Sequence, residues 1–589
     1  MTEVLNISTL PTPNSKDITD FIKLDNSLNK IELQLKNNPI NLYNKDFENG
    51  TYRIQKPGYY ILQEDIVFNP NPSVWNSSNN SLEGNDWMPT KEQTEGGINA
   101  DYPIAPYGGY HLGFFSSITI ESDDVILDLN HYTISQSIEH YLQQRFYSHI
   151  EFASTPFIPP QGPSNFGQII FCSNVKIKNG SLGLSSHSGI HGNNMTNVLI
   201  ENLNIYNYEQ AGMSLNGSET VYVRNVTVDN SSRNVFVNAK YSHSRFIRPF
   251  VQNAIENGNP TIKINDVYLS GSEILDQLQQ EMNTVYNDVV NYKRKPTSAL
   301  YSNNEQIIDG NIYGVVFNVS GVAVNSFVTE TNPSKRNNNI LVENLSICDL
   351  DSNPKEVVAL NDFDENNQPT YGKKVQLGPV GDVFRILEVT NSNGNYVPNV
   401  LANAHCYVAK YKNVAYATRT TIEQYIYDEW ITSASNILDP SKIQYELGVD
   451  SMAHIMKGSI GLFLSGAQNS QFYNIIIKSV KNNGDNGNVD KKTEYTTTYE
   501  GNVCRGTAIV ACKNVYIDGI HIDTIYSKSS QAIGLDFVNR SSDIEIKHFS
   551  ISNIRSCDFL NLGEFPNLPG YSKIINGEQN VTNLKMEKF

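Results

Sequence analysis

Two histidines four residues apart are the first side chains in this sequence that suggest chemistry. His187 and His191 lie in the stretch SLGLSSHSGIHGNN (181–194). An HxxxH pair binds zinc when both side chains lie on one face of a helix. Histidine also titrates near neutral pH, which suits general acid–base catalysis. The choice between these chemistries depends on the secondary structure around the pair and on the direction in which His191 points.

A nine-residue phrase of alternating apolar residues surrounds this stretch and recurs along the chain. Alternation with a period of two predicts a strand with one buried face. Two residues interrupt the alternation in the middle of each phrase, so we expect the chain to bend there. The first three copies follow one another at intervals of 23 residues. The copies lie at 174–182, 197–205, 220–228, 339–347, 469–477, 514–522 and 543–551.

The second residue of each interruption is of a restricted type. Asn and Gly tolerate the left-handed backbone best, and His is also enriched there. We therefore predict a left-handed corner residue in all seven phrases. These residues are Asn179, Asn202, Asn225, Asn344, Asn474, Gly519 and His548.

A glycine lies nine or ten residues before the second residue of most phrases, where the first strand of the phrase begins, and it starts a further short apolar strand. The glycines are Gly189, Gly212, Gly461, Gly506 and Gly534. Each coil would then hold three short strands, and coils of 22–24 residues fit a parallel β-helix whose strands stack about 4.8 Å apart. An antiparallel sandwich would instead show tight hairpins and no constant step. We predict an all-β fold, a right-handed parallel β-helix with an N-terminal helical cap and two α-containing insertions.

The repeat divides the chain into solenoid segments and insertions. Apolar residues near helical spacing predict a helix over 18–38, which we expect to cover the open end of the solenoid. An oligomerisation or anchoring helix is the alternative. The predicted segments are an N-terminal cap or anchor (1–57), β-helix (58–239), an α-rich insertion (240–311), β-helix coils (312–350), an α/β insertion (351–457) and C-terminal coils (458–589).

Extra sequence enters the coils at one kind of corner only. The expansions follow Ile134, Val228, Ile347 and Val480, which lie at the corresponding corner of their coils. They therefore leave from one side and border the glycine-led sheet. Insertions on one face of a repeat protein often mark the binding face, so a groove or a subunit interface is expected on this sheet.

The alternation also predicts where His191 points. Ile190 and Gly192 match inward residues of other coils, so His191 faces outward on the glycine-led sheet. Its expected neighbours one coil away are Gln168 and Ser214. Neither is a carboxylate, whereas a glycoside hydrolase needs two carboxylates across the bond.

Two interpretations of His191 remain, and a metal site is not one of them. The pair is not helical and no third ligand is evident, so we predict no metal. The sequence also lacks P-loop, GxGxxG and GxSxG motifs, so no cofactor is predicted. The plainer interpretation is an exposed strand histidine without chemistry. In an enzyme, His191 would act as acid or base with help from Glu209 or Arg233 of the corner loops.

The coil phrases and their corner asparagines resemble the pectin-lyase-like superfamily of right-handed parallel β-helices. Polysaccharide lyases and polygalacturonases of that fold keep catalytic residues on the face where His191 lies. A second resemblance is to β-helix proteins of giant DNA viruses that infect amoebae and algae. It is carried by GYYILQEDIVFNP (58–70), LGFFSSITIESDDVILDLNHYTISQS (112–137) and residues 139–167. That likeness implies a component of a virus particle.

Composition narrows the function classes. The net charge of −17 disfavours a general nucleic-acid role, because phosphate binding relies on Lys and Arg. No apolar run is long enough for a membrane span, and no signal-peptide pattern begins the sequence. We expect a structural or surface protein of a giant virus particle, made in the host cytoplasm. Its expected partners are copies of itself, other virion proteins or glycans. The alternative is a carbohydrate-active enzyme, a lyase, epimerase or hydrolase of an acidic polysaccharide.

Overall fold

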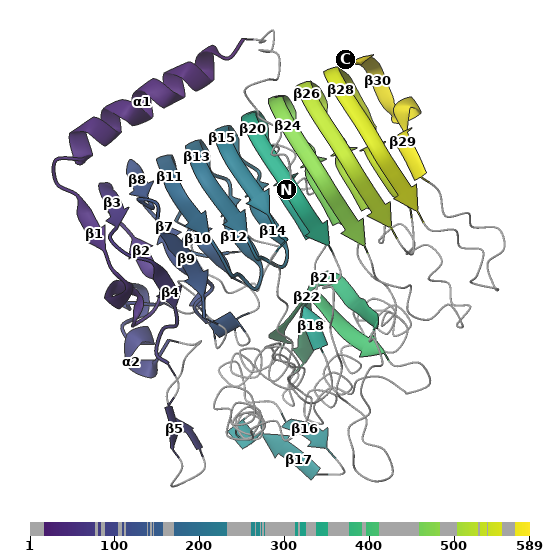
Figure 1. The fold of residues 1–589 in the computed structure, drawn as a ribbon. Helices are drawn as coiled ribbons and strands as arrows, with labels where there is room; N and C mark the ends of the chain where they lie inside the picture. Colours follow the sequence, from purple (N-terminus) through teal and green to yellow (C-terminus); the bar gives the residue numbers. More distant parts are fainter. Residues whose placement is uncertain are drawn as a thin grey trace, which may run out of the picture.

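The structure is a computed structural model, and two parallel sheets dominate it (Figure 1). It describes residues 17–72, 74–76, 81–83, 89–103, 109–110, 113–137, 140–141, 144, 147–156, 170–231, 261–264, 267–270, 272–273, 276, 313–315, 319–325, 337–351, 376–390, 396–410, 459–482, 504–527, 531–538, 540–556 and 572–588.

The larger sheet, which we call the long sheet, has 13 strands, and the glycine-led sheet has 10. In spatial order the long sheet holds β1 (Ile40–Leu42), β3 (Gly58–Leu62), β8 (Val125–Asp128), β11 (Ser173–Leu182), β13 (Thr196–Tyr206), β15 (Glu219–Asp229), β20 (Asn338–Asp351), β24 (Gln468–Asn482), β26 (Lys513–Ser527), β28 (Ser541–Ser556) and β30 (Val581–Lys588), with β4 (Ile66–Phe68) and β9 (Thr133–Gln136) beside the first coils. The glycine-led sheet holds β2 (Tyr52–Ile54), β7 (Ser116–Ile120), β10 (Ser148–Glu151), β12 (Ser188–Asn193), β14 (Ala211–Asn216), β19 (Val319–Asn325), β23 (Ser459–Ser465), β25 (Cys504–Val510), β27 (Ala532–Phe537) and β29 (Ser572–Asn576).

The predicted parallel β-helix is confirmed, and the chain alternates between the two sheets as it winds. The solenoid begins earlier than we expected, because β1 and β2 within 1–57 already pair with β3 and β7. The expected three strands per coil merge into two. From β11 onward, the two halves of each phrase form one bent strand, since hydrogen bonding resumes directly after the corner residue.

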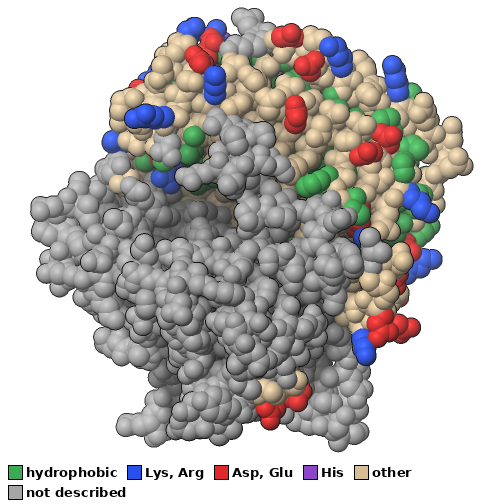
Figure 2. All heavy atoms as spheres, turned by 180° about the vertical axis from the view of Figure 1, so that it is seen from behind, with side chains coloured by type: hydrophobic (Ala, Val, Ile, Leu, Met, Phe, Trp, Pro, Cys, Tyr) green, Lys and Arg blue, Asp and Glu red, His purple; other side chains and the backbone are tan. Residues whose placement is uncertain are grey.

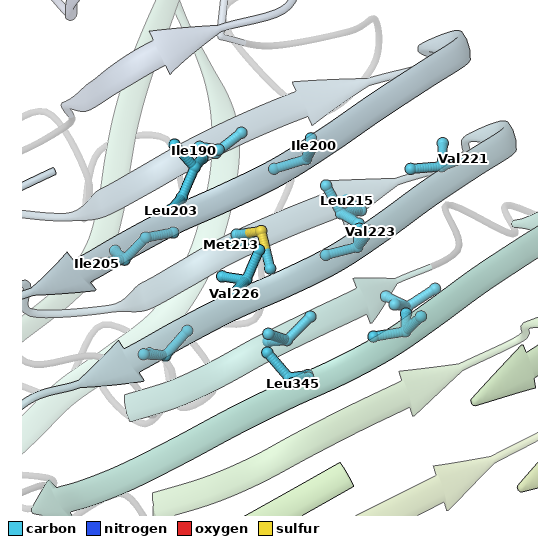
Figure 3. Close-up of a cluster of buried hydrophobic side chains, with 14 of the residues drawn as sticks. Ile190, Ile200, Leu203, Ile205, Met213, Leu215, Val221, Val223, Val226 and Leu345 are labelled. Atoms are coloured by element: carbon cyan, nitrogen blue, oxygen red, sulfur yellow. The ribbon is translucent and has the colours of Figure 1, made fainter. Parts of the chain in front are cut away.

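Apolar side chains from both sheets fill the interior (Figure 3). Ile190 and Met213 of the glycine-led sheet point toward Leu203, Ile205 and Val226 of the long sheet. All five are at most 1% exposed. Burial of this continuous core supplies most of the stabilisation of the solenoid, at about 25 cal/mol for each Å² of apolar surface removed from water.

The glycine column marks a close approach between the two sheets. A Cβ atom on Gly461 or Gly506 would lie 2.4 Å from the Cγ2 atom of Ile477 or Ile522 in the same coil. A real side chain cannot occupy that distance. Glycine therefore lets the corner of each coil close tightly over the core, and this explains its recurrence at the position identified in the sequence.

All seven predicted corner residues have a positive φ, from 46° at His548 to 75° at Gly519. Their side chains form an amide ladder in which each Asn donates to the Asn of the preceding coil. The ladder runs through Asn179, Asn202, Asn225, Asn344 and Asn474 at donor–acceptor distances of 3.0–3.3 Å. It stops at Gly519, which has no amide, and the Oδ1 atom of Asn474 is left buried without a hydrogen-bond partner.

Replacing Gly519 with Asn is expected to stabilise the protein by about 1 kcal/mol. The new amide would donate to the Oδ1 atom of Asn474 and continue the ladder, and the loss of glycine lowers the entropy of the unfolded chain. Urea unfolding of the two proteins measures the change. Gly519→Ala is the matched control: it adds strain at positive φ without an amide, so it should destabilise. Equal effects of Asn and Ala would contradict a role for the ladder.

The predicted N-terminal helix is present as α1 (Thr19–Leu35). It lies along the outer face of the long sheet, whereas we expected it over the open end (Figure 1). Phe21, Leu24 and Leu28 form its apolar stripe and pack against side chains of successive coils, Leu199, Tyr222, Leu341, Tyr473 and Tyr516. A helix of 17 residues is about 25 Å long, which matches roughly five strand spacings.

Buried ion pairs fix the second half of α1 to the same face. Glu32 accepts hydrogen bonds from Lys176 at 2.9 Å and from Lys178 at 2.5 Å. The two lysines also pair with Glu201 and Asp128, at 3.0 and 3.2 Å. Burial opposes ionisation of Glu32, but the two lysine hydrogen bonds outweigh it and hold the pKa of the carboxyl below its ordinary value.

Long segments separate a long-sheet strand from the next glycine-led strand between β15 and β19 and between β20 and β23, and the insertion bounds 240–311 and 351–457 stay predictions. In the second, β21 (Gln376–Thr390) and β22 (Tyr396–Lys410) pair antiparallel on either side of 391–395, and β18 (Tyr313–Val315) joins them. The first holds an antiparallel pair, β16 (Thr261–Ile264) and β17 (Val267–Ser270). The helical parts that we expected in the two insertions lie largely outside the described residues.

The surface of the described residues carries both signs of charge. In the view from behind, Lys and Arg side chains are interspersed with Asp and Glu (Figure 2). A search of the described residues for a helix both long and apolar enough to cross a membrane found none.

Candidate functional site

Register pairing lines up one outward side chain from each of the first five strands of the glycine-led sheet. Arg53 of β2 pairs with Thr119 of β7, and Thr119 pairs with Glu151 of β10. Glu151 pairs with His191 of β12, and His191 with Ser214 of β14. We call these five residues the outward column. His191 thus points where the sequence predicted.

Glu151 and His191 form a close hydrogen-bonded pair in this column. The Nδ1 atom of His191 lies 2.7 Å from Oε2 and 2.9 Å from Oε1 of Glu151. The side chain of Glu151 is 1% exposed and that of His191 is 16% exposed. A buried carboxylate that accepts from the imidazole Nδ1–H orients the ring and stabilises the charge that forms when Nε2 takes a proton.

The other ring nitrogen contacts an amide. Asn216, two residues beyond Ser214 in β14, donates from Nδ2 to the Nε2 atom of His191 at 3.1 Å. The same amide nitrogen also lies 3.2 Å from Oδ1 of Asn193. Together these contacts fit a neutral imidazole with its hydrogen on Nδ1 and its lone pair on Nε2. His191 is therefore held in the tautomer that a general base requires.

The prediction that Gln168 lies beside His191 was wrong, and so was the conclusion that no carboxylate lies beside His191. The residue that pairs with His191 on that side is Glu151, 40 residues earlier rather than 23. The chain between β10 and β11 is longer than the corresponding connection of the regular coils, and this broke the constant step on which the alignment rested. A local signal was present, because Ser-His-Ile-Glu (148–151) matches Ser-Gly-Ile-His (188–191) position by position.

The environment of Glu151 alters its acidity. Burial raises the pKa of its carboxyl, and the His191 imidazole and the Ser148 hydroxyl offset part of that rise. Ser148 donates to Oε2 of Glu151 at 3.1 Å. The carboxyl is thus held by two hydrogen-bond donors in a site that excludes water, which strengthens its interaction with the imidazole.

Strand β10 also holds a buried histidine, His149. His149 lies opposite Gly189, and its Nε2 atom is 3.1 Å from the carbonyl oxygen of Gly183. Burial lowers the pKa of His149 to about 4. The group is therefore neutral in the folded protein at neutral pH.

His149 is expected to make the protein less stable in acid. Its folded pKa of about 4 lies below the unfolded value near 6.5, so the unfolded chain binds the proton first. Stability should fall as pH drops from 6.5 toward 4, by about 2 kcal/mol at pH 5. Urea unfolding at pH 7 and pH 5 measures the difference, and His149→Gln should remove this part of it. In the control His131→Asn, an exposed corner residue, the difference should persist.

The other predicted site residues do not join His191 in the outward column. Glu209 is buried at the corner before β14, where it accepts a hydrogen bond from the hydroxyl of Tyr141. His187 lies in the loop before β12, as expected, with Nδ1 3.0 Å from the hydroxyl of Ser188. Arg233 lies outside the described residues. Among the described residues, no group of three His, Cys, Asp or Glu side chains is arranged to hold a metal ion.

A second histidine–carboxylate pair lies on the long sheet. The Nδ1 atom of His548 is 2.6 Å from Oδ1 of Asp518, which also accepts from the hydroxyl of Tyr516 at 3.0 Å. His548 occupies the corner position of its coil, one coil beyond Gly519. Gly519 in the preceding coil offers no side-chain amide, so His548 pairs with the carboxylate of Asp518 beside it. The pair is therefore explained by the interruption of the ladder and not by catalysis.

The chain is similar to the A module of the mannuronan C-5 epimerase AlgE6 of Azotobacter vinelandii, with a TM-score of 0.25 and 7% sequence identity. The similarity covers 93% of this chain and 99% of that one. No protein-family model and no curated protein matches the sequence.

Proposed function

We propose that the protein is a carbohydrate-active enzyme that removes a proton from a uronate residue of an acidic polysaccharide. One observation carries this proposal: on the outward column, His191 is bonded through Nδ1 to the buried carboxylate of Glu151. A histidine oriented by a carboxylate is a suitable base for a carbon acid next to a carboxyl group.

The proposed reaction begins when substrate replaces the Asn216 amide at Nε2. His191 then takes the proton from the carbon beside the uronate carboxyl, and the electron pair of the broken C–H bond moves into that carboxyl group. In a lyase, this pair forms a C=C bond as the glycosidic C–O bond breaks, and the leaving oxygen gains a proton. In an epimerase, a proton returns to the opposite face of the same carbon. The Asn216 amide, once displaced from Nε2, can donate to the substrate carboxylate.

The carboxylates of the site favour this chemistry over glycoside hydrolysis. Hydrolysis requires an acid and a second carboxylate that face each other across the bond. Glu151 is committed to His191, and Glu121 accepts two hydrogen bonds from Arg53, at 2.8 and 2.6 Å. One oriented base is sufficient for proton abstraction.

Incubation with uronate polymers in D₂O tests the proposal. We expect either unsaturated ends, detected by ultraviolet absorbance, or deuterium at the carbon beside the carboxyl, detected by NMR. Alginate, polygalacturonate and hyaluronate would be compared with a neutral polymer such as mannan, which has no acidic C–H bond. Absence of both signals for every uronate polymer would overturn the proposal.

We also propose a structural role in a giant virus particle, as the sequence resemblance implies. The packing of α1 favours a rigid body, since one helix joins side chains of several coils through apolar contacts and buried ion pairs. Quantitative mass spectrometry of purified particles should then find the protein in many copies. Its absence from particles, with the protein present in infected cells, would remove this proposal.

A further inference from the structure

A separate polar cavity lies at the N-terminal end of the solenoid. It has a volume of about 510 Å³, within the range of small-molecule sites. Two segments form its walls, 46–55, which includes β2, and 93–102, which follows the start of α2 (Lys91–Thr94). From this cavity we infer a binding site for a neutral oligosaccharide, and this inference does not depend on the proposed function.

Three hydrogen bonds join the two walls and hold the cavity in shape. Gln93 donates to the carbonyl oxygen of Asn49 at 2.7 Å. The hydroxyl of Tyr102 donates to the carbonyl oxygen of Thr51 at 3.0 Å. Arg53 donates to the carbonyl oxygen of Asp101 at 2.9 Å. Because these bonds already hold the walls in place, the walls lose little conformational entropy when a ligand binds.

The charges around the cavity select against anions. Arg53 is the cation of the lining, and its guanidinium is already committed to the buried carboxylate of Glu121 and to the backbone of Asp101. The carboxylates of Asp46 and Asp101 also line the cavity, and both residues are exposed. Their charge repels a phosphate or uronate ligand.

The remaining lining groups suit hydroxyl groups. The side chains of Asn49 and Asn99 are exposed and form no hydrogen bond with the described residues, so each amide can both donate and accept. The carboxylate of Asp101 accepts only. Sugar hydroxyls are donors and acceptors at once, and the half-buried Tyr52 adds apolar surface for the C–H face of a ring.

The cavity lies within reach of the outward column. Arg53 is three strand steps from His191 in register, which corresponds to about 14 Å. A polysaccharide held in the cavity by a neutral segment can therefore extend along the glycine-led sheet. The site would then anchor a polymer that carries both neutral and charged residues.

Calorimetric titration of the full chain with cellohexaose, maltohexaose, mannohexaose and chitohexaose tests the inference. We expect at least one neutral hexamer to bind with a Kd of about 1 mM or tighter. The double variant Asn99→Ala/Asp101→Ala should weaken that binding at least tenfold. The control Asp20→Ala/Asn37→Ala, an exposed pair of the same residue types outside the cavity, should leave it unchanged, as should His191→Ala.

Hexagalacturonate separates this site from the proposed active site. The proposed function directs it to His191, so the cavity variant should bind it no less tightly than the unaltered protein. If no neutral hexamer binds, or if Asn99→Ala/Asp101→Ala weakens hexagalacturonate and leaves the neutral hexamers unaffected, the inference fails. Either result would leave the uronate reaction of the preceding section to be judged on its own products.

Discussion

Replacing His191 with alanine is expected to lower the rate of proton abstraction from a uronate polymer by about 10²- to 10⁴-fold. The imidazole supplies the base, and its Nε2 atom is the ring nitrogen that does not face Glu151. The loss leaves the buried carboxyl of Glu151 without its imidazole partner, so some loss of stability is expected beside the loss of activity. Initial rates of unsaturated product or of deuterium incorporation measure the effect, and urea unfolding checks the fold.

Two further variants test whether the loss of activity is specific to the Glu151–His191 pair. Glu151→Gln keeps the size of the side chain but removes the charge that stabilises the imidazolium, so we expect a loss of about 10- to 100-fold. His548→Asn alters the other histidine–carboxylate pair and places a corner-compatible residue there. It should retain full activity. A His191→Ala protein with undiminished activity would show that the base lies elsewhere.

Replacing Glu32 with glutamine is expected to lower the free energy needed to detach α1 from the sheet by about 3 kcal/mol. The change leaves the ammonium groups of Lys176 and Lys178 buried with one carboxylate fewer, and the side chains of these lysines are only 6% and 9% exposed. Loss of one partner from a buried pair is costly because the remaining charge has little water to compensate it. Hydrogen exchange of the α1 amides should accelerate about 100-fold.

An exposed pair on the same helix supplies the comparison. Lys23 lies 3.3 Å from Asp20, and their side chains are 71% and 66% exposed. Lys23→Gln should change exchange in α1 by less than about fivefold, since exposed pairs contribute at most about 1 kcal/mol. Equal acceleration by the two variants would mean that charge burial does not hold the helix.

The solenoid could be predicted because its determinants are local and repeated. Each corner needs one residue that accepts a positive φ, and Asn202 or Asn474 shows that requirement within a nine-residue phrase. The position of α1 was harder to predict. Its apolar stripe was visible in Phe21, Leu24 and Leu28, but nothing local tells a helix which apolar surface it will cover. The partner residues come from strands far apart in the sequence.

Only part of the candidate site could be predicted from the sequence. The direction of His191 follows from the alternation of its own strand. The identity of its partner depends on which earlier strand lies beside it, and that strand was hidden because more residues separate β10 from β11 than in the regular coils. Asn216 was missed for a different reason: it reaches Nε2 diagonally, from two residues beyond the position paired with His191. Prediction of contacts of this kind requires knowledge of the register between the two strands.

The contact map of α1 has a consequence for the order of events during synthesis. Gln471 donates to the carbonyl oxygen of Asp17, a contact that spans 454 residues. At about 5–20 residues per second, roughly 25–90 s separate the emergence of these two partners from a ribosome. The helix is made among the first segments, yet its binding surface is complete only after most coils have formed. Docking of α1 on the long sheet would therefore occur only once the coils have assembled in the correct register.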